Sequence, residues 1–217
     1  MSELLRVIET SGETTSRSYL LRTPGWTEEQ YFEEAPEMQF VEFEDGEIIM
    51  HSPVNIRHQK ITSFLSFLLR GLADAKDLGE VFNGPAVVRL RENLDYEPDI
   101  FFVPKASLNH LADQYFMGAP LFIIEVISPS TRSHDLRTKA ENYRRHGVQE
   151  YWAIDLEQQA VYSHGMPEDR TLPYSVVRVT NGRLQSSVIA GFLIDVDWLW
   201  QQTLPSAMDC LNLLLSR

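Results

Sequence analysis

A carboxylate in the middle of an apolar run constrains the fold of this chain more than any other feature. The run covers residues 121–127, and every side chain in it except that of Glu125 is apolar. A short, continuous apolar run of this kind is typical of a strand that is buried on both faces of a sheet. An ionised carboxylate in such a strand is costly unless it pairs with a cation, binds a metal ion or changes its pKa.

A second acid stands beside another apolar strand. Residues 100–103 are apolar and directly follow a Glu-Pro-Asp triplet that ends at Asp99. Two acids on neighbouring hydrophobic strands form a site for a divalent cation, so Asp99 and Glu125 are candidate metal ligands. Each acid also has an alternative role that remains open. Asp99 would cap backbone amides in a turn after the proline. Glu125 would form a buried ion pair with an arginine such as Arg89 or Arg137.

Composition limits the partners and the compartment that we expect. The formal net charge is -12 and the pI is about 4.9. Phosphate binding is mainly electrostatic, so this negative charge argues against nucleic-acid binding over the whole surface. It still permits a local basic groove that binds nucleic acid. The single cysteine, Cys210, excludes an internal disulfide and is expected in the core. No run approaches the roughly 18 apolar residues of a membrane span. We therefore expect a cytoplasmic protein that has no membrane partner.

Hydrophobic periodicity predicts one α/β domain over residues 26–217, preceded by a polar N-terminal extension over residues 1–25. Asp45-Gly46 and Asn181-Gly182 are both typical of hairpin turns. The expected elements, in chain order, are a helix at 27–34, a hairpin at 40–51, a helix at 56–75, a strand over 80–90 that is interrupted near 84–85, strands at 100–103 and 121–127, a helix that ends at 146, strands at 150–155 and 159–164, a hairpin at 174–188, and one or two closing helices over 198–216. The strand, helix and strand over 121–155 imply a parallel crossover in a mixed sheet.

The order of these acids resembles a known class of nucleases. Glu97-Pro98-Asp99 before one strand, followed 26 residues after Asp99 by Glu125 in the next strand, resembles the PD-(D/E)XK nuclease superfamily. The chain resembles one branch of this superfamily more closely, the Uma-type restriction-endonuclease-like family of bacteria. The matching residues are Glu125-Val126-Ile127-Ser128-Pro129-Ser130-Thr131, Asp135, Lys139, Tyr143, Gly147-Val148-Gln149-Glu150-Tyr151-Trp152, the hairpin at 41–47 and His58-Gln59. The resemblance covers residues 27–164 and implies a restriction-endonuclease-like mixed central sheet that is flanked by helices, with additional hairpins.

The resemblance also implies an activity and a cofactor. The activity is Mg²⁺-dependent DNA endonuclease, with Mn²⁺ as a possible substitute. Asp99 and Glu125 would each supply an oxygen to the cation, and the backbone carbonyl of Val126 would supply a third, which suits a hard cation. Such a cation polarises a phosphoryl oxygen and lowers the pKa of bound water. The alternative function is a catalytically inactive module on the same fold that binds nucleic acid or another partner.

The chain departs from the superfamily pattern at the lysine. In that pattern a lysine stands two residues after the second acid, where this chain has Ile127. We therefore expect Lys139 to reach back to the strand end, where it would orient the attacking water or stabilise negative charge. On this hypothesis its replacement slows cleavage and leaves the melting temperature nearly unchanged. The alternative is a solvated lysine that pairs with Asp135.

Several other residues are candidates for secondary roles. Glu42 is a candidate catalytic acid that holds a metal-bound water, or else an exposed strand residue. His58 is expected to be a half-buried, satisfied histidine rather than a ligand, and Tyr143 is expected to be structural beside Lys139. The basic residues contact phosphates or balance the acidic surface: Arg57, Lys60, Arg132, Arg137, Arg144 and Arg145. A two-fold homodimer is the simplest arrangement for cutting both strands of DNA.

Overall fold

The strand that carries Glu125 lies inside a six-stranded mixed sheet, with the strand order β12-β11-β10-β9-β7-β4. The computed structural model describes residues 19–34 and 41–216. The strands of this central sheet are β4 (Gly79–Asn83), β7 (Ile100–Pro104), β9 (Phe122–Ile127), β10 (Glu150–Asp155), β11 (Ala160–Gly165) and β12 (Ser175–Val179). β9 runs parallel to β10 and antiparallel to β7. The strand-helix-strand unit and the mixed sheet predicted from the sequence are both confirmed.

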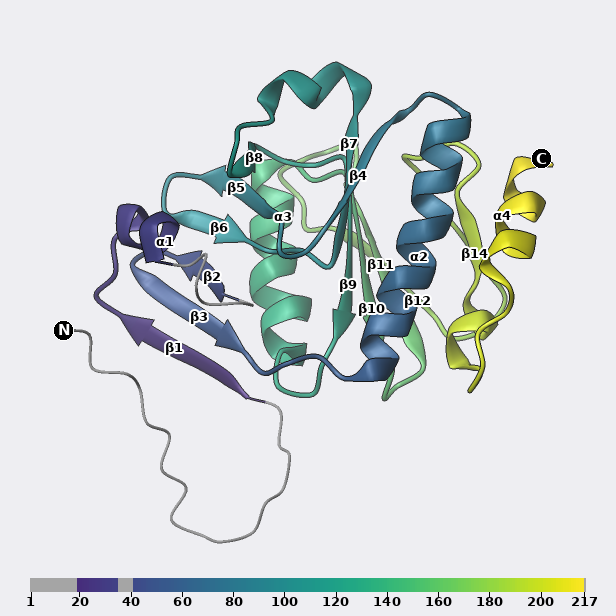
Figure 1. The fold of residues 1–217 in the computed structure, drawn as a ribbon, viewed down its shortest axis with the longest axis horizontal. Coiled ribbons are helices and arrows are strands. Elements are labelled where there is room, and N and C mark those ends of the chain that lie inside the picture. Colours follow the sequence, from purple (N-terminus) through teal and green to yellow (C-terminus); the bar gives the residue numbers. More distant parts are fainter. Residues whose placement is uncertain (1–18, 35–40, 217) are drawn as a thin grey trace, which may run out of the picture.

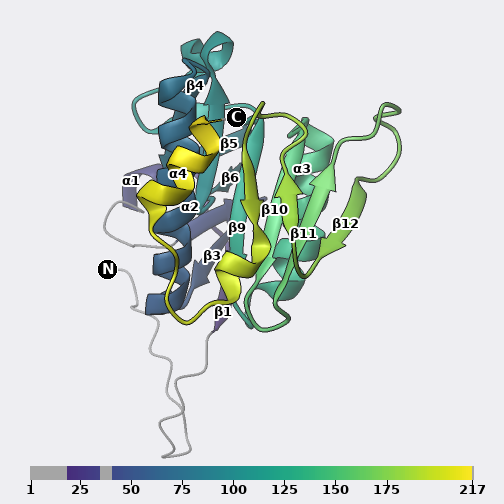
Figure 2. The same ribbon diagram turned by 90° about the vertical axis from the view of Figure 1, so that its right-hand side faces the viewer.

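Helices cover both faces of the central sheet (Figure 1). α2 (Ile56–Ala75) lies on one face, and α4 (Ala207–Leu215) packs beside it (Figure 2). On the other face, η3 (His134–Lys139) continues directly into α3 (Ala140–His146). Side chains in a strand alternate between faces, so Phe122, Ile124 and Val126 join the core under α2, while Ile123 and Ile127 join the core under α3. Glu125 therefore points to the α3 side.

A second six-stranded sheet, with the order β1-β3-β2-β6-β5-β8, packs on the α3 side of the molecule. Its strands are β1 (Leu20–Pro24), β2 (Val41–Glu44), β3 (Glu47–His51), β5 (Val87–Arg91), β6 (Leu94–Tyr96) and β8 (Tyr115–Met117). Asp45 and Gly46, with φ of 49° and 89°, form the tight turn of the predicted first hairpin. Of the extension expected over residues 1–25, residues 1–18 lie outside the described residues, and β1 pairs with β3.

The helix α1 (Glu28–Glu34) begins where the sequence predicts. The Gln30 amide donates to Thr27 Oγ1 at 3.2 Å, and the Thr27 amide donates to Gln30 Oε1 at 2.9 Å. This reciprocal pair satisfies two amides that a helix start leaves without partners. In the described part of the chain, no helix is both long and apolar enough to span a membrane.

The second predicted hairpin is wrong. β12 pairs with β11 at the edge of the central sheet, while β13 (Arg183–Gln185) pairs with β14 (Leu193–Asp195). The turn between β12 and β13 binds other partners, because the Gly182 amide donates to Asp197 Oδ2 and the Gly182 carbonyl accepts from the Val196 amide. The interrupted strand at 80–90 likewise divides into β4 and β5, which belong to different sheets.

The C-terminal part of the chain completes the core on the α2 face. η4 (Val196–Trp200) and α4 are the predicted closing helices, and a further short helix, η2 (Lys105–His110), follows β7. The approach of α4 to α2 is close, since a Cβ atom at Gly71 would lie 2.5 Å from a methyl carbon of Leu211. Cys210 is buried in this core, as expected.

Replacing His164 with phenylalanine should remove a pH-dependent contribution to stability. His164 lies between the rings of Tyr151 and Tyr174, and its Nε2 has no partner among the described residues. Burial lowers the pKa of His164 to about 4, below the value of roughly 6.5 that histidine has in an unfolded chain. The unfolded chain therefore binds the proton more tightly, and about 3 kcal/mol of stability is lost as the pH falls from about 6.5 to 4.

Urea unfolding of wild type and His164→Phe across that pH range checks this expectation. The variant should lose less stability than wild type on acidification. Parallel curves for the two proteins would show that His164 does not carry the effect.

Candidate active site

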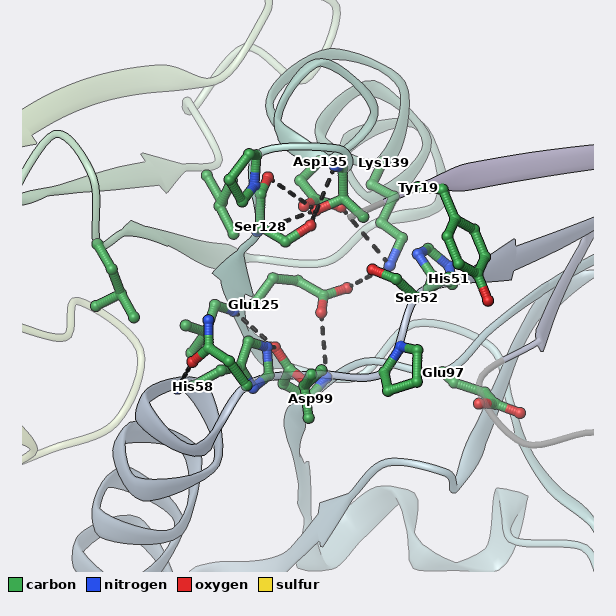
Figure 3. Close-up of a pocket in the computed structure, with 18 of the residues that line it drawn as sticks. Tyr19, His51, Ser52, His58, Glu97, Asp99, Glu125, Ser128, Asp135 and Lys139 are labelled. Atoms are coloured by element: carbon green, nitrogen blue, oxygen red, sulfur yellow. Dashed lines mark hydrogen bonds and ion pairs between the residues drawn. The ribbon is translucent and has the colours of Figure 1, made fainter. Parts of the chain in front are cut away.

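A cavity of about 580 Å³ opens where the second sheet meets the C-terminal end of β9. Five elements line it: β2, β3, the first turn of α2, β9 and η3. The four residues predicted to be catalytic, Glu42, Asp99, Glu125 and Lys139, all lie in its wall. Figure 3 shows Lys139 and Glu125 pointing toward one another, with Asp99 on the other side of Glu125.

Two hydrogen bonds tie Asp99 to the strand segment of Glu125 and Val126. β7 and β9 pair with Ile100 opposite Ile124, which places the residue before β7 beside Glu125. The Asp99 amide donates to Glu125 Oε2 at 3.1 Å, and the Val126 amide donates to Asp99 Oδ2 at 2.7 Å. The alternative for Asp99 as a turn cap is partly correct, because its carboxylate does accept a backbone amide, although from the neighbouring strand.

Lys139 lies between two carboxylates. Its Nζ is 2.8 Å from Glu125 Oε1 and 2.6 Å from Glu42 Oε1, and its side chain is only 4% exposed. The predicted reach of Lys139 back to the strand is confirmed, and the alternative of a solvated lysine is wrong. Asp135 is a more distant partner, with Oδ1 at 3.9 Å from Nζ.

The arginines considered as partners of Glu125 lie elsewhere. Arg89 binds Asp95 and Glu28, each at 3.1 Å, and Arg137 is exposed. The ion pair of Glu125 is therefore made by Lys139, which approaches from the helix after the strand. An arginine partner was wrong because η3 turns its lysine, and not its arginine, toward this side of β9.

Glu42 is a buried member of the same cluster. Its Oε1 also accepts from the Glu97 amide at 3.1 Å, and its Oε2 lies 3.1 Å from His51 Nε2. The alternative of an exposed strand residue is wrong, because the second sheet turns this face of β2 toward η3. Glu42 therefore holds Lys139 from the side opposite Glu125.

The helix that carries Lys139 is not regular. Residues 134–139 form a π-helix, which widens the turn before the chain continues as α3. π-helical turns are often found at functional sites. Lys139 and Tyr143, one turn apart, both reach Glu125, with the Tyr143 hydroxyl donating to Oε1 at 2.9 Å. Ile127, at the usual lysine position, packs instead in the core under α3.

Carboxylates outnumber cations in this cluster, and their pKa values reflect it. Burial raises the pKa of Glu125 to about 7, because the opposing effect of Lys139 is offset by Asp99 and Asp135. Burial and Glu42 raise the pKa of Glu97 to about 8. Burial also acts on Glu42, but Lys139 and His51 together hold its pKa well below the usual value. A further cation beside Glu125 would relieve the repulsion among these acids.

Three residues at the site were missed or underrated by the sequence analysis. His58 is satisfied, as expected, but it is buried rather than half-buried, and its Nε2 lies 3.1 Å from Asp99 Oδ2. Burial is the largest single influence on the pKa of His58 and lowers it, but the hydrogen bond to Asp99 and the charges of Asp99 and Glu125 together raise it more, so the net shift is upward. His51 and Glu97 also line the cavity. Glu97 had a signal in the sequence, since it precedes Pro98-Asp99, whereas His51 had none.

The oxygens of Asp99 and Glu125 suit a hard divalent cation. Among the described residues, no group of three or more His, Cys, Asp and Glu side chains is arranged to hold a metal ion. Mg²⁺ does not need such a cage, because it commonly binds one or two carboxylates and keeps several waters. Two adjacent carboxylates, the nearby carbonyl of Val126 and an excess of negative charge therefore fit this ion.

Most of the basic residues around α3 balance acids. Arg132 binds Asp155 at 2.7 Å, and Arg144 and Arg145 bind Glu141 at 2.8 and 2.7 Å. Separately, Arg57 donates to backbone carbonyls near the end of η4. These four arginines support the structural alternative over phosphate contacts.

Comparison with known proteins identifies the family. The sequence model of Uma2, described as "Putative restriction endonuclease", matches residues 28–197. A crystal structure described as "a putative nuclease belonging to DUF820 from Anabaena variabilis ATCC 29413" matches with a TM-score of 0.58 and 18% identity over 74% of this chain and 89% of that one. The type IIG restriction endonuclease BpuSI matches with a TM-score of 0.35 and 14% identity over 72% of this chain and 17% of that one. No curated protein matches. The match over residues 28–197 shows that this chain belongs to the Uma2 family of restriction-endonuclease-like proteins, as the motifs in its sequence predicted.

Proposed function

We propose that the protein is a Mg²⁺-dependent DNA endonuclease that hydrolyses phosphodiester bonds, with Mn²⁺ able to replace Mg²⁺. The observation that supports this most is the meeting of Asp99 and Glu125 in a cavity wall. The Asp99 amide donates to Glu125 at 3.1 Å, the Asp99 carboxylate accepts from the Val126 amide at 2.7 Å, and Lys139 Nζ lies 2.8 Å from Glu125. Membership of a nuclease family and the fold support the same class of activity.

Each residue of the cluster has a proposed task. Asp99, Glu125 and the carbonyl of Val126 bind the cation, whose chemistry is to polarise a phosphoryl oxygen and acidify a bound water. Lys139 places a positive charge next to Glu125, where it orients the attacking water and stabilises negative charge that develops on the phosphate. Glu42 positions Lys139 through the 2.6 Å contact with its Nζ. Tyr143 fixes the Oε1 side of Glu125.

One observation favours the alternative of an inactive module. The charge of Lys139 is already engaged by two buried carboxylates. A cluster that is neutralised in this way can serve the fold alone. The two functions differ in their response to metal, because only the enzyme requires a cation at Asp99 and Glu125.

Mn²⁺ should stabilise the folded protein. The cation binds the folded site and not the unfolded chain, so mass action favours the folded state. At a Mn²⁺ concentration about 100 times the dissociation constant, the gain is roughly 2.7 kcal/mol, or about 5–10 °C in melting temperature for a chain of this size. Thermal melts with and without Mn²⁺ measure the shift.

Glu125→Gln is the matched control for these melts. It keeps the size of the side chain and the acceptor for Tyr143 and removes the charge. We expect the shift to disappear in this variant. A shift of the same size in Glu125→Gln would place the Mn²⁺ site elsewhere and remove the main support for the enzyme.

DNA is the proposed partner, and a homodimer in the cytoplasm is the proposed working form. Two copies related by a two-fold axis present two clusters to the two strands of a duplex. Light scattering after size-exclusion chromatography, with and without duplex DNA, measures the number of copies. A single copy in both conditions would exclude the dimer and leave a nicking enzyme.

A further inference from the structure

A second cavity lies beside the first. Its volume is about 420 Å³, and it shares four lining residues with the active-site cavity: Val54, His58, Glu97 and Asp99. The two cavities are therefore parts of one groove that passes the Asp99 carboxylate. A substrate strand that reaches Asp99 can continue into the second cavity without leaving the surface.

One face of α2 forms a wall of this second cavity. Gln59, Ser63, Phe67 and Arg70 line it and recur at intervals of three or four residues, which places them on one side of the helix. We call the cavity that they line the α2 groove.

The facing wall of the α2 groove is held in place by side-chain hydrogen bonds. Asn83 lies in this wall; its Oδ1 accepts from Ser66 Oγ at 2.6 Å, and its Nδ2 donates to the Asp99 carbonyl at 3.1 Å. The α2 groove is thus tied directly to the backbone of a candidate metal ligand, so the position of its walls is fixed relative to the active site.

The chemistry of the α2 groove suits a nucleotide strand. Phe67 is 40% exposed and contributes an aromatic side chain to the wall. Arg70 is exposed and donates to the Val81 carbonyl at 2.6 Å, which holds the guanidinium at the groove. Among the described residues that line the α2 groove, Glu97 and Asp99 at the junction are the only acids. In a chain of net charge -12, this is a surface on which phosphates meet little repulsion.

We propose that the α2 groove binds unpaired nucleotides of the DNA strand that flank the phosphate at Asp99, with a base stacked on Phe67 and a phosphate near Arg70. The proposal rests on the proposed function, because it takes the scissile phosphate to lie at Asp99 and Glu125. Aromatic stacking and cationic contacts are the usual means of binding single strands. A paired base in a duplex is already stacked on both faces, so Phe67 selects a base that is unpaired.

The length of the flanking strand follows from the geometry of α2. Phe67 lies nine residues after His58, which is about 13 Å along a helix. At about 3.4 Å per stacked nucleotide, the base on Phe67 is roughly four nucleotides from the phosphate at Asp99. A blunt duplex end cannot supply that base, whereas a frayed end or a single-stranded extension of four or more nucleotides can.

Binding of labelled DNA in Ca²⁺, measured by fluorescence anisotropy, tests the α2 groove. Ca²⁺ takes oxygen ligands and offsets the charge of Asp99 and Glu125. The probes are one duplex with blunt ends and the same duplex with single-stranded extensions of two, four or eight nucleotides at either end. We expect wild type to bind the four- and eight-nucleotide extensions more tightly than the blunt duplex. Phe67→Ala should weaken binding of these extensions about 5- to 100-fold and leave the blunt duplex unchanged.

Two further variants separate stacking from other effects. Phe67→Trp keeps an aromatic face and should retain the preference for extensions. Leu213→Ala removes a side chain of α4 that is 55% exposed, outside both cavities, and should bind like wild type. Equal affinity of wild type and Phe67→Ala for the extended probes overturns the proposal, as does equal loss in Phe67→Ala and Leu213→Ala.

Failure of this inference is distinguishable from failure of the proposed function. If nicking depends on Asp99 and Phe67→Ala binds the extended probes like wild type, the protein is an endonuclease whose α2 groove does not bind DNA. If Phe67→Ala loses binding and the protein does not cleave DNA, the α2 groove binds the strand and the proposed nuclease activity is wrong.

Discussion

Asp99→Asn and Glu125→Gln should each reduce the nicking of supercoiled plasmid DNA by about 100- to 1,000-fold in the presence of Mg²⁺ or Mn²⁺. The physical reason is the loss of a carboxylate ligand of the cation, which stabilises the negative charge that develops on the phosphate. Removal of one group that stabilises such charge costs about this much in other enzymes. Conversion of supercoiled to open-circular plasmid, followed over time on gels, measures the rate.

The controls for this experiment separate chemistry from folding. Asp77→Asn removes a surface carboxylate whose side chain is 81% exposed, and it should nick DNA at the wild-type rate. The circular dichroism spectrum of each variant should match that of wild type. Asparagine or glutamine at these positions keeps a side-chain oxygen, and this oxygen can accept the same backbone hydrogen bond as the carboxylate that it replaces. Wild-type nicking in both Asp99→Asn and Glu125→Gln would exclude this cluster as the catalytic site.

Lys139→Met should unfold far more easily than wild type and should also fail to cleave DNA. The change leaves Glu42 and Glu125 buried without their shared cation, and loss of one partner from a buried ion pair costs about 3–5 kcal/mol. For a chain of this size the melting temperature falls on the order of 10 °C. This replaces the expectation from the sequence that the melting temperature would hardly change, because the structure buries Lys139 between two acids.

Lys60→Met, an exposed lysine on α2, is the matched control and should leave the melting temperature within about 1–2 °C of wild type. The double variant Glu42→Gln/Lys139→Met removes one of the two orphaned charges and should recover part of the lost stability, since residues in contact do not contribute additively. A Lys139→Met protein as stable as wild type would show that Lys139 is not buried between the two acids.

Much of the site could be predicted because it depends on local patterns. The apolar run around Glu125 identified a buried strand, and alternation along a strand fixes which side chains share a face. Because Ile127 stands at the position where a lysine is usual, the cation had to come from another segment, and the next helix contains Lys139. Asp99 followed from a Pro-Asp pair directly before an apolar strand, and the backbone register of β7 and β9 brings it to Glu125.

The features of the site and fold that the sequence did not predict depend on contacts between segments that are distant in sequence. His51 reaches the cluster only because the second sheet packs against η3, and the pattern of its own hairpin does not indicate that contact. Glu42 was a candidate acid from the sequence, but its burial against Lys139 depends on the same packing. The π-helix at 134–139 differs from an α-helix by a small change in hydrogen bonding that composition does not encode. The second hairpin was predicted wrongly because Asn181-Gly182 fits a turn equally well when its two flanking strands pair with other neighbours.

Anomalous diffraction from crystals soaked in Mn²⁺ shows whether Asp99 and Glu125 bind a divalent cation. We expect one strong anomalous peak within about 2.5 Å of carboxylate oxygens of both residues, with the hydrogen bond from the Val126 amide to Asp99 changed to admit the ion. The same soak of Glu125→Gln crystals should lose the peak. A fully soaked wild-type crystal with no peak there, in which Asp99 still accepts from the Val126 amide and Lys139 still lies between Glu42 and Glu125, would show that the cluster is a structural ion network and not a metal site.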